Sequence, residues 1–170
     1  MFDGPIRQLP LKIVGHSIRS FCQIGPEGTT CPCIFDTGAV YTAIPQKFWS
    51  DQFRREEIDR PEFKTVNRVS VFGQTCRAKR VPVQIVILGE LDPQRLLEPG
   101  KEEYLNDNEI NFGECLADFL FDEELPVFVP QRKSKRLRYV YIGLGGGTFR
   151  NGGLCINWVK PEAVLVEQLG

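Results

Sequence analysis

Residues 33–45 read Cys33-Ile34-Phe35-Asp36-Thr37-Gly38-Ala39-Val40-Tyr41-Thr42-Ala43-Ile44-Pro45. An apolar run ends here at Asp36, and an aspartate at the end of a buried strand is costly unless it has partners or a chemical task. Gly38 allows a tight turn, which can point backbone N–H groups and the Thr37 hydroxyl at the carboxylate. An aspartate that only initiates a turn is the alternative, and it stays open at this point.

Most segments on either side of this stretch have the pattern of β-strands. Apolar residues alternate with others from 9 to 13, and a second β-prone run covers 18–24. Residues 66–88 predict a β-hairpin whose second arm alternates strictly over 81–87. Further extended runs follow at 139–142 and 154–158. A short helix is expected after Pro45, within 46–53, so the sequence predicts an all-β domain with little helix.

The glycines at 143–147 and the single histidine could each suggest a functional site, but the surrounding residues support neither. A G-x-G-x-x-G motif that starts at Gly143 needs a glycine where the sequence has Thr148, and no G-K-[ST] follows. A Ser–His or Cys–His catalytic pair would have to use His16, the single histidine, and nothing near it identifies a partner. We therefore expect neither a phosphate-binding loop nor a serine-type hydrolase.

Length and composition describe one ordinary domain that covers residues 1–170. With 42% hydrophobic and 25% charged residues, the chain can bury a normal core. A formal net charge of −1 does not favour nucleic acid as a partner, and the apolar runs are too short to span a membrane. The N-terminus lacks the pattern of a signal peptide, so we expect a cytoplasmic protein with reduced cysteines.

Residues 91–136 are the least readable part of the chain. Acidic residues dominate 98–124, and a basic cluster follows at 132–138. The simplest interpretation is a solvated, charged excursion from the domain. A nucleic-acid or targeting patch, contact between the two blocks, and steering of a charged substrate are the alternatives.

Two segments together resemble the aspartic proteases. The segment 33–45, with Asp36-Thr37-Gly38-Ala39 after an apolar run, resembles their active-site segment. Tyr141-Ile142-Gly143 is similar to the second signature of the family, and residues 151–158 are similar to the closing strand of its retroviral-type members. The order of these segments and the hairpin between them fit the same layout. The sequence therefore resembles a retropepsin-like aspartic protease domain.

The resemblance implies a fold, a reaction and a partner. The fold would be the closed β-barrel or sandwich of the acid proteases, with half of an active site in each chain. Asp36 would be the catalytic residue of an endopeptidase. No other aspartate of the chain is followed by Thr-Gly or Ser-Gly, so the second carboxylate would come from Asp36 of a second copy in a homodimer. The two carboxylates would activate a water, with no metal or cofactor.

Neighbouring residues take supporting roles in this resemblance. Thr37 would brace the two active-site loops across the dimer axis, and Gly38 would let the backbone of a peptide or protein substrate approach. The hairpin at 66–88 would act as a flap, although an ordinary sheet hairpin is the alternative. The C-terminal residues 163–169 could form a dimer strand or a short helix. Substrate contacts would come from Ala39, Val40, Phe72, Gly73 and Leu144.

Two positions depart from the retroviral-type pattern. Viral members usually carry Asp after the Ala and Arg after the glycine of the second signature, and these two residues form an ion pair. This chain has Val40 and Leu144 there, so both charges are missing together and no single charge is stranded. The departure keeps a second function open, a retropepsin-like module that binds peptides or dimerises without cleavage. A third is an unrelated β domain that binds metal through cysteines.

Overall fold

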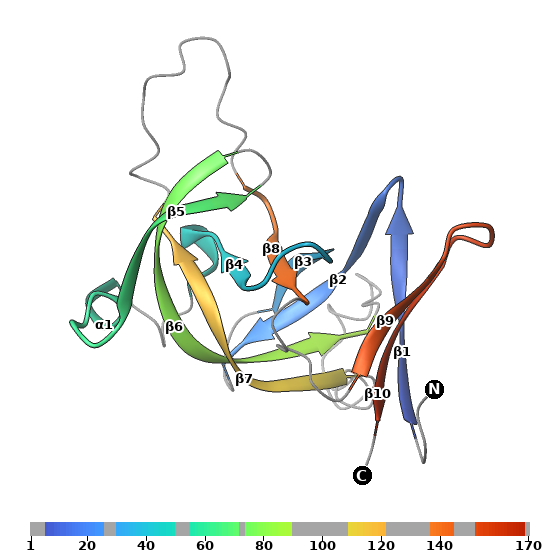
Figure 1. Ribbon diagram of the computed structural model, residues 1–170. Coiled ribbons are helices and arrows are strands. Elements are labelled where there is room, and N and C mark those ends of the chain that lie inside the picture. Colours follow the sequence, from blue (N-terminus) through green and yellow to red (C-terminus); the bar gives the residue numbers. More distant parts are fainter. Residues whose placement is uncertain are drawn as a thin grey trace, which may run out of the picture.

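The computed structural model describes residues 6–25, 30–49, 55–71, 74–89, 109–121, 137–144 and 152–168, and Figure 1 shows their arrangement. The described residues form ten strands, one 3-10 turn and one short α-helix. These are β1 (Ile6–Val14), β2 (Ser17–Ile24), β3 (Thr30–Asp36), β4 (Thr42–Ile44), η1 (Gln46–Phe48), α1 (Arg55–Ile58), β5 (Lys64–Val71), β6 (Gln74–Leu88), β7 (Glu109–Leu120), β8 (Val140–Gly143), β9 (Gly152–Asn157) and β10 (Glu162–Gln168).

Six of the strands close into a barrel. The order of hydrogen-bonded neighbours is β6, β7, β4, β8, β3 and β2, and β2 pairs again with β6. In this closing contact Phe21 lies opposite Leu88 and Ile24 lies opposite Ile85. The pairs β3–β8 and β4–β7 run parallel, and the other neighbours in the ring run antiparallel. The structure therefore confirms an all-β fold that is built as a closed barrel.

The barrel interior follows from the period-two patterns of the sequence. Along β2, buried residues alternate with partly exposed ones over the whole strand. Alternate side chains of a strand face opposite sides of the sheet, so β2 sends Cys22 and Ile24 inward, and β6 sends Ile85 and Ile87 inward. Burial of each large apolar side chain contributes about 1.5–3 kcal/mol. One apolar core thus fills the barrel.

Strand β7 shows that the interpretation of 91–136 as a solvated excursion is wrong for residues 109–120. The strand was not recognised in the sequence because it contains a β-bulge. The bulge lies at Gly113, which has φ 72°, where the register between β6 and β7 shifts. A bulge inserts one residue and exchanges the two faces of the strand, so no single alternation runs through the segment. The inward side chains of β7 are Ile110 and Phe112 before the bulge and Ala117 and Phe119 after it. The rest of the predicted excursion, residues 90–108 and 122–136, lies outside the described residues.

Strand β1 connects the barrel to a three-stranded arm. Its last residues, Lys12–Val14, pair with β2, and the segment Ile6–Leu11 pairs with β10. β10 also pairs with β9, and Figure 1 shows β1, β9 and β10 together at one side of the barrel. The sequence left both a dimer strand and a short helix open for the C-terminal segment. The structure shows a strand, β10, which pairs with β1 and β9 of the same chain.

The predicted hairpin is formed by β5 and β6. Val71 lies opposite Gln74 at its end, and the connecting residues Phe72 and Gly73 lie outside the described residues. The short helix expected after Pro45 is present as η1, and residues 50–54 lie outside the described residues. Within the described part of the chain, neither helical segment has the length and hydropathy to cross a membrane.

Candidate active site

Asp36 is the last residue of β3, and its side chain begins a tight turn. Its Oδ1 accepts a hydrogen bond from the Gly38 N–H at 3.2 Å, and its backbone carbonyl accepts one from the Ala39 N–H, also at 3.2 Å. Asp36 is partly exposed. The bond to Oδ1 sets the direction of the carboxylate relative to the backbone, which a reacting group requires, and the bond between backbone groups closes the turn. An aspartate that only initiates a turn would make the same two bonds.

The two segments that resemble the family signatures lie side by side. β3 and β8 are parallel neighbours, and Asp36 lies opposite Gly143. The Gly143 N–H donates a hydrogen bond to Oγ1 of the fully buried Thr42 at 3.2 Å. A Cβ at Gly143 would lie only 2.6 Å from the carbonyl carbon and oxygen of Tyr41. Glycine is therefore required at 143, because the segment after the Asp36 turn packs directly on its backbone.

Asp36 lies on the face of the barrel wall that the hairpin covers. Cys33 and Phe35 belong to the barrel core, so by strand alternation Ile34 and Asp36 face the other side. Ile34 belongs to a second buried cluster, which also contains Val71 and Cys76. These two residues flank the connection of the hairpin. The part of the hairpin next to its connection therefore packs on the face that carries Asp36. The further members of the cluster are Ala43, Ala78, Leu120, Leu137 and Tyr141.

The remaining predicted residues differ in exposure. Thr37 and Gly38 are exposed at the turn, and Ala39 is partly buried. Val40 is 48% exposed, whereas Leu144 is partly buried and packs against the barrel core. Phe72 and Gly73 lie outside the described residues. The structure thus brings together the Asp36 turn and the segment 141–144.

Sequence reasoning missed a charged cluster beside the turn. Arg80 on β6 and Asp118 on β7 are cross-strand partners and form an ion pair, with the Arg80 Nε 2.9 Å from the Asp118 Oδ1. The Arg80 guanidinium carbon lies 3.7 Å from the centroid of the Tyr41 ring. The sequence contained a signal for a charged partner, since Asp118 is the one charged residue among the apolar residues 116–121. It could have been recognised only once 109–120 was assigned as a strand.

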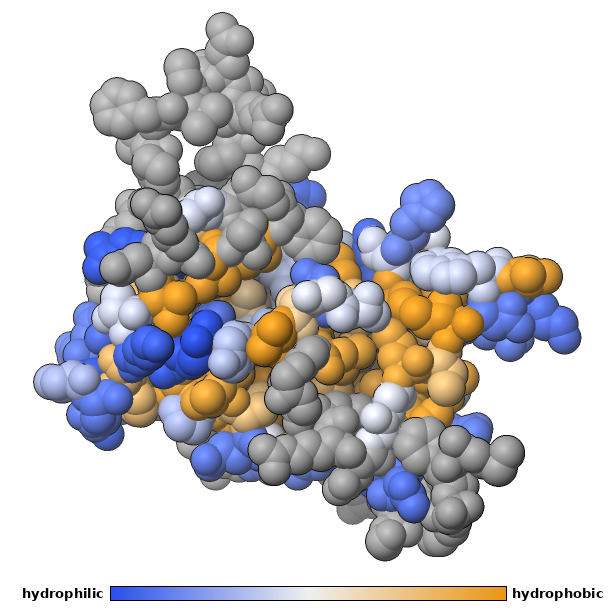
Figure 2. Space-filling model, in the orientation of Figure 1, coloured by the Kyte–Doolittle hydropathy of each residue, from blue (hydrophilic) through white to orange (hydrophobic). Residues whose placement is uncertain are grey.

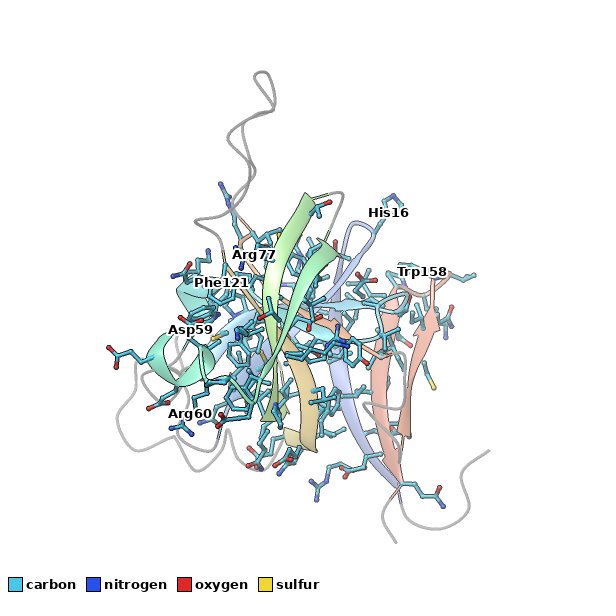
Figure 3. The ribbon with its side chains drawn as sticks, turned by 60° about the vertical axis from the view of Figure 1, so that its left-hand side comes forward. His16, Asp59, Arg60, Arg77, Phe121 and Trp158 are labelled. Atoms are coloured by element: carbon cyan, nitrogen blue, oxygen red, sulfur yellow. The ribbon has the colours of Figure 1, made fainter. Side chains whose placement is uncertain are left out.

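The six cysteines and the histidine lie outside the Asp36 turn. None of the six cysteines forms a disulfide bond. Burial, with a smaller contribution from Cys22, raises the pKa of Cys31 to about 12. Among the described residues, no three His, Cys, Asp or Glu side chains gather into a group that could hold a metal ion. His16 is exposed in the turn between β1 and β2, and Figure 3 shows it pointing away from the barrel.

One of three comparisons with known proteins identifies the fold. Neither a protein-family profile nor a curated protein matches the sequence. The fold is similar to the crystal structure of a retropepsin-like aspartic protease from Rickettsia conorii, with a TM-score of 0.51 and 11% sequence identity. The match covers 98% of this chain and 95% of that chain. The chain therefore has the retropepsin-like fold, as the two signature-like segments of its sequence indicated.

Proposed function

We propose that the chain is an aspartic endopeptidase that works as a homodimer, with Asp36 as its catalytic residue. The observation that carries the proposal is the position of Asp36. It ends β3 in a tight turn, lies opposite Gly143 on β8, and faces the side of the wall on which the hairpin packs. In this proposal the chain is a single catalytic domain over 1–170, and it needs no metal or cofactor.

In the proposed mechanism, two Asp36 carboxylates meet across a two-fold axis. Two carboxylates about 3 Å apart cannot both ionise easily, so the pair holds one proton. The ionised carboxylate takes a proton from a water, and the protonated one donates to the carbonyl oxygen of the peptide. The water oxygen bonds to the carbonyl carbon, which then carries two hydroxyls. The carboxyl that took the water proton donates it to the nitrogen, the carbon–nitrogen bond breaks, and one hydroxyl returns its proton to the other carboxylate. Each chain supplies one half of this acid–base pair.

Substrate binding follows from the surroundings of the turn. An extended peptide would bind largely through main-chain hydrogen bonds, and Gly38 would let its backbone approach the carboxylates. Val40 and Leu144 would give the nearby pocket an apolar lining, together with Ala39. The β5–β6 hairpin, with Phe72 and Gly73 at its tip, would close over the peptide and exclude water.

A second copy of the chain is the proposed partner because one chain supplies one Asp-Thr-Gly sequence. Apolar side chains that the described chain leaves exposed are consistent with association. Trp158 is 56% exposed and Val159 is 93% exposed at the β9–β10 turn, and Figure 2 shows apolar surface over this arm. Nucleic acid and membranes are not among the proposed partners. The proposed location is the cytoplasm, where the six thiols, none of them in a disulfide bond, would stay reduced.

A peptide-binding or dimerisation module without cleavage is the second candidate. The observation that favours it is the pair Val40 and Leu144, which replaces the charged pair of the retroviral-type pattern. The charged pair is absent, although the Asp36 turn itself is intact.

Cleavage of a mixed peptide library between pH 4 and 7 separates the two candidates. The wild-type protein should cleave, and a statine-type mimic of the transition state should inhibit it. Asp36→Asn should lower cleavage by about 10²–10⁴-fold, because the homodimer loses both carboxylates of the pair. Absence of cleavage by a dimeric wild-type protein would favour the binding module. Equal cleavage by both proteins would remove Asp36 from the mechanism.

A further inference from the structure

A buried ion pair lies on the barrel wall beside the Asp36 turn. The Arg80 Nε donates to the Asp118 Oδ1 at 2.9 Å, and the Arg80 Nη2 donates to the Asp118 Oδ2 at 3.3 Å. The exposed fractions of the two side chains are 19% for Arg80 and 4% for Asp118. Two parallel bonds of this kind fix the plane of the guanidinium. Buried ion pairs add little net stability, whereas their fixed geometry can specify one arrangement of the chain.

The face of this guanidinium lies over Tyr41. The distance from its central carbon to the ring centroid is 3.7 Å, which is well within the range of a cation–π contact. Tyr41 stands between the Asp36 turn and β4, and Arg80 stands on the strand that forms the second arm of the hairpin. The Arg80 side chain therefore connects the hairpin strand β6 to Asp118 on β7 and to Tyr41 next to the Asp36 turn.

From Tyr41, contacts continue to the catalytic candidate. The backbone of Tyr41 packs so closely on Gly143 that no Cβ would fit there. The next residue, Thr42, accepts the Gly143 N–H through its buried hydroxyl. Gly143 is in turn the strand partner of Asp36. Tyr41 therefore links Arg80, which its ring contacts, to the β3–β8 pair, which its backbone contacts.

We propose that Arg80, oriented by Asp118, is a positioning residue that holds Tyr41 and thereby the Asp36 turn in its reactive geometry. This inference rests on the proposed function, because it assigns a role in the same site. Arg80 touches neither substrate nor the reacting atoms in this role. It acts through the ring of Tyr41, so removal of the pair should lower the rate of the chemical step more than it weakens substrate binding.

The decisive variant replaces both charges, Arg80→Leu with Asp118→Leu. Apolar residues of similar volume commonly replace a buried ion pair without loss of stability, so the double variant should remain folded. Its kcat per dimer, counted by titration with a statine-type inhibitor, should fall about 10–100-fold while KM changes by less than about threefold. The same kcat as in the wild type would overturn the proposal, since a purely stabilising pair would give that result.

Two further variants keep the test decisive if the double variant does not fold. Tyr41→Phe retains the aromatic ring under the guanidinium and should retain most of kcat, whereas Tyr41→Leu should lose about as much kcat as the double variant. Equal kcat for Tyr41→Phe and Tyr41→Leu would contradict the proposal. The matched control is Arg19→Leu, because Arg19 also lies over a tyrosine ring, that of Tyr139, at 5.1 Å. It should keep the wild-type kcat.

A readout that needs no cleavage separates this inference from the proposed function. The backbone amide signals of Gly38 and Gly143 in ¹H–¹⁵N spectra should shift in the double variant and in Tyr41→Leu, but not in Arg19→Leu. If these signals shift and the wild type cleaves no peptide, the positioning role stands and the protease proposal fails. If the wild type cleaves while the signals and kcat stay unchanged in the variants, the positioning role fails.

Discussion

At the scale of single residues, Gly143 shows how the two signature-like segments depend on each other. A methyl group there would lie 2.6 Å from backbone atoms of Tyr41, which cannot rotate away as a side chain can. Gly143→Ala should therefore lower the free energy of unfolding by about 1–3 kcal/mol, measured by urea unfolding. Gly153→Ala is the control, because a Cβ at Gly153 meets nothing within 4 Å. Equal stability of the two variants would contradict the close packing of Tyr41 on Gly143.

Gly38 presents the opposite case, in which glycine is needed for function and not for the fold. A Cβ at Gly38 would meet the Asp36 Oδ1 at 3.7 Å, which is an ordinary contact. Gly38→Ala should therefore change the free energy of unfolding by less than about 0.5 kcal/mol. Cleavage should nevertheless fall by at least about tenfold, since a methyl group would stand where the substrate backbone approaches. Unchanged kcat/KM in a stable Gly38→Ala protein would remove this role from Gly38.

At the scale of elements, the sequence predicted most strands and missed β7 for a definable reason. β1, β2 and the second arm of the hairpin over 81–87 keep one alternation, so their faces could be assigned from the residues alone. β7 exchanges its faces at the Gly113 bulge, and acidic residues occupy several of its outward positions. The Asp36 turn was predictable from local turn chemistry. The Tyr41–Arg80–Asp118 contact was not, because it needs the register between β6 and β7.

The pairing of β2 with β3 places buried thiols together and predicts how stability depends on pH. Burial, and to a lesser extent Cys22, raises the pKa of Cys31 from 9.0 to about 12. A hydrogen bond with Cys33, together with burial, raises the pKa of Cys22. The folded state therefore holds these protons more tightly than the unfolded state does. Their contribution to stability is complete below pH 9 and is lost as the pH rises towards 12.

Urea unfolding under reducing conditions between pH 8 and 10.5 measures this effect. Above pH 9, each such thiol should lower the free energy of unfolding by about 1.4 kcal/mol per pH unit. In Cys31→Ala, the free energy of unfolding should fall less steeply with pH, because one of the thiols that contribute to the slope is missing. Cys155→Ala, which removes an exposed thiol on β9, is the control for the substitution itself. A flat profile from pH 9 to 10.5 would contradict the burial of the β2–β3 thiols.

At the scale of the whole molecule, the proposed reaction requires two chains, because each contributes one Asp36. An equimolar mixture of wild type and Asp36→Asn, allowed to exchange subunits, should contain about one quarter wild-type dimers by random association. A mixed dimer has one carboxylate and should be inactive, so activity per wild-type chain should fall to about half. Dilution of the wild type alone should lower its specific activity as the dimer dissociates.

The control for this mixture is wild type with an equal mass of albumin, which should keep its full activity. Subunit exchange must be complete before the assay, and a size shift with a tagged Asp36→Asn chain measures it directly. If exchange is complete and activity per wild-type chain is unchanged, one chain contains a whole active site. The second carboxylate would then have to come from the same chain. This result would contradict the homodimer proposal, which assigns half of the active site to each chain.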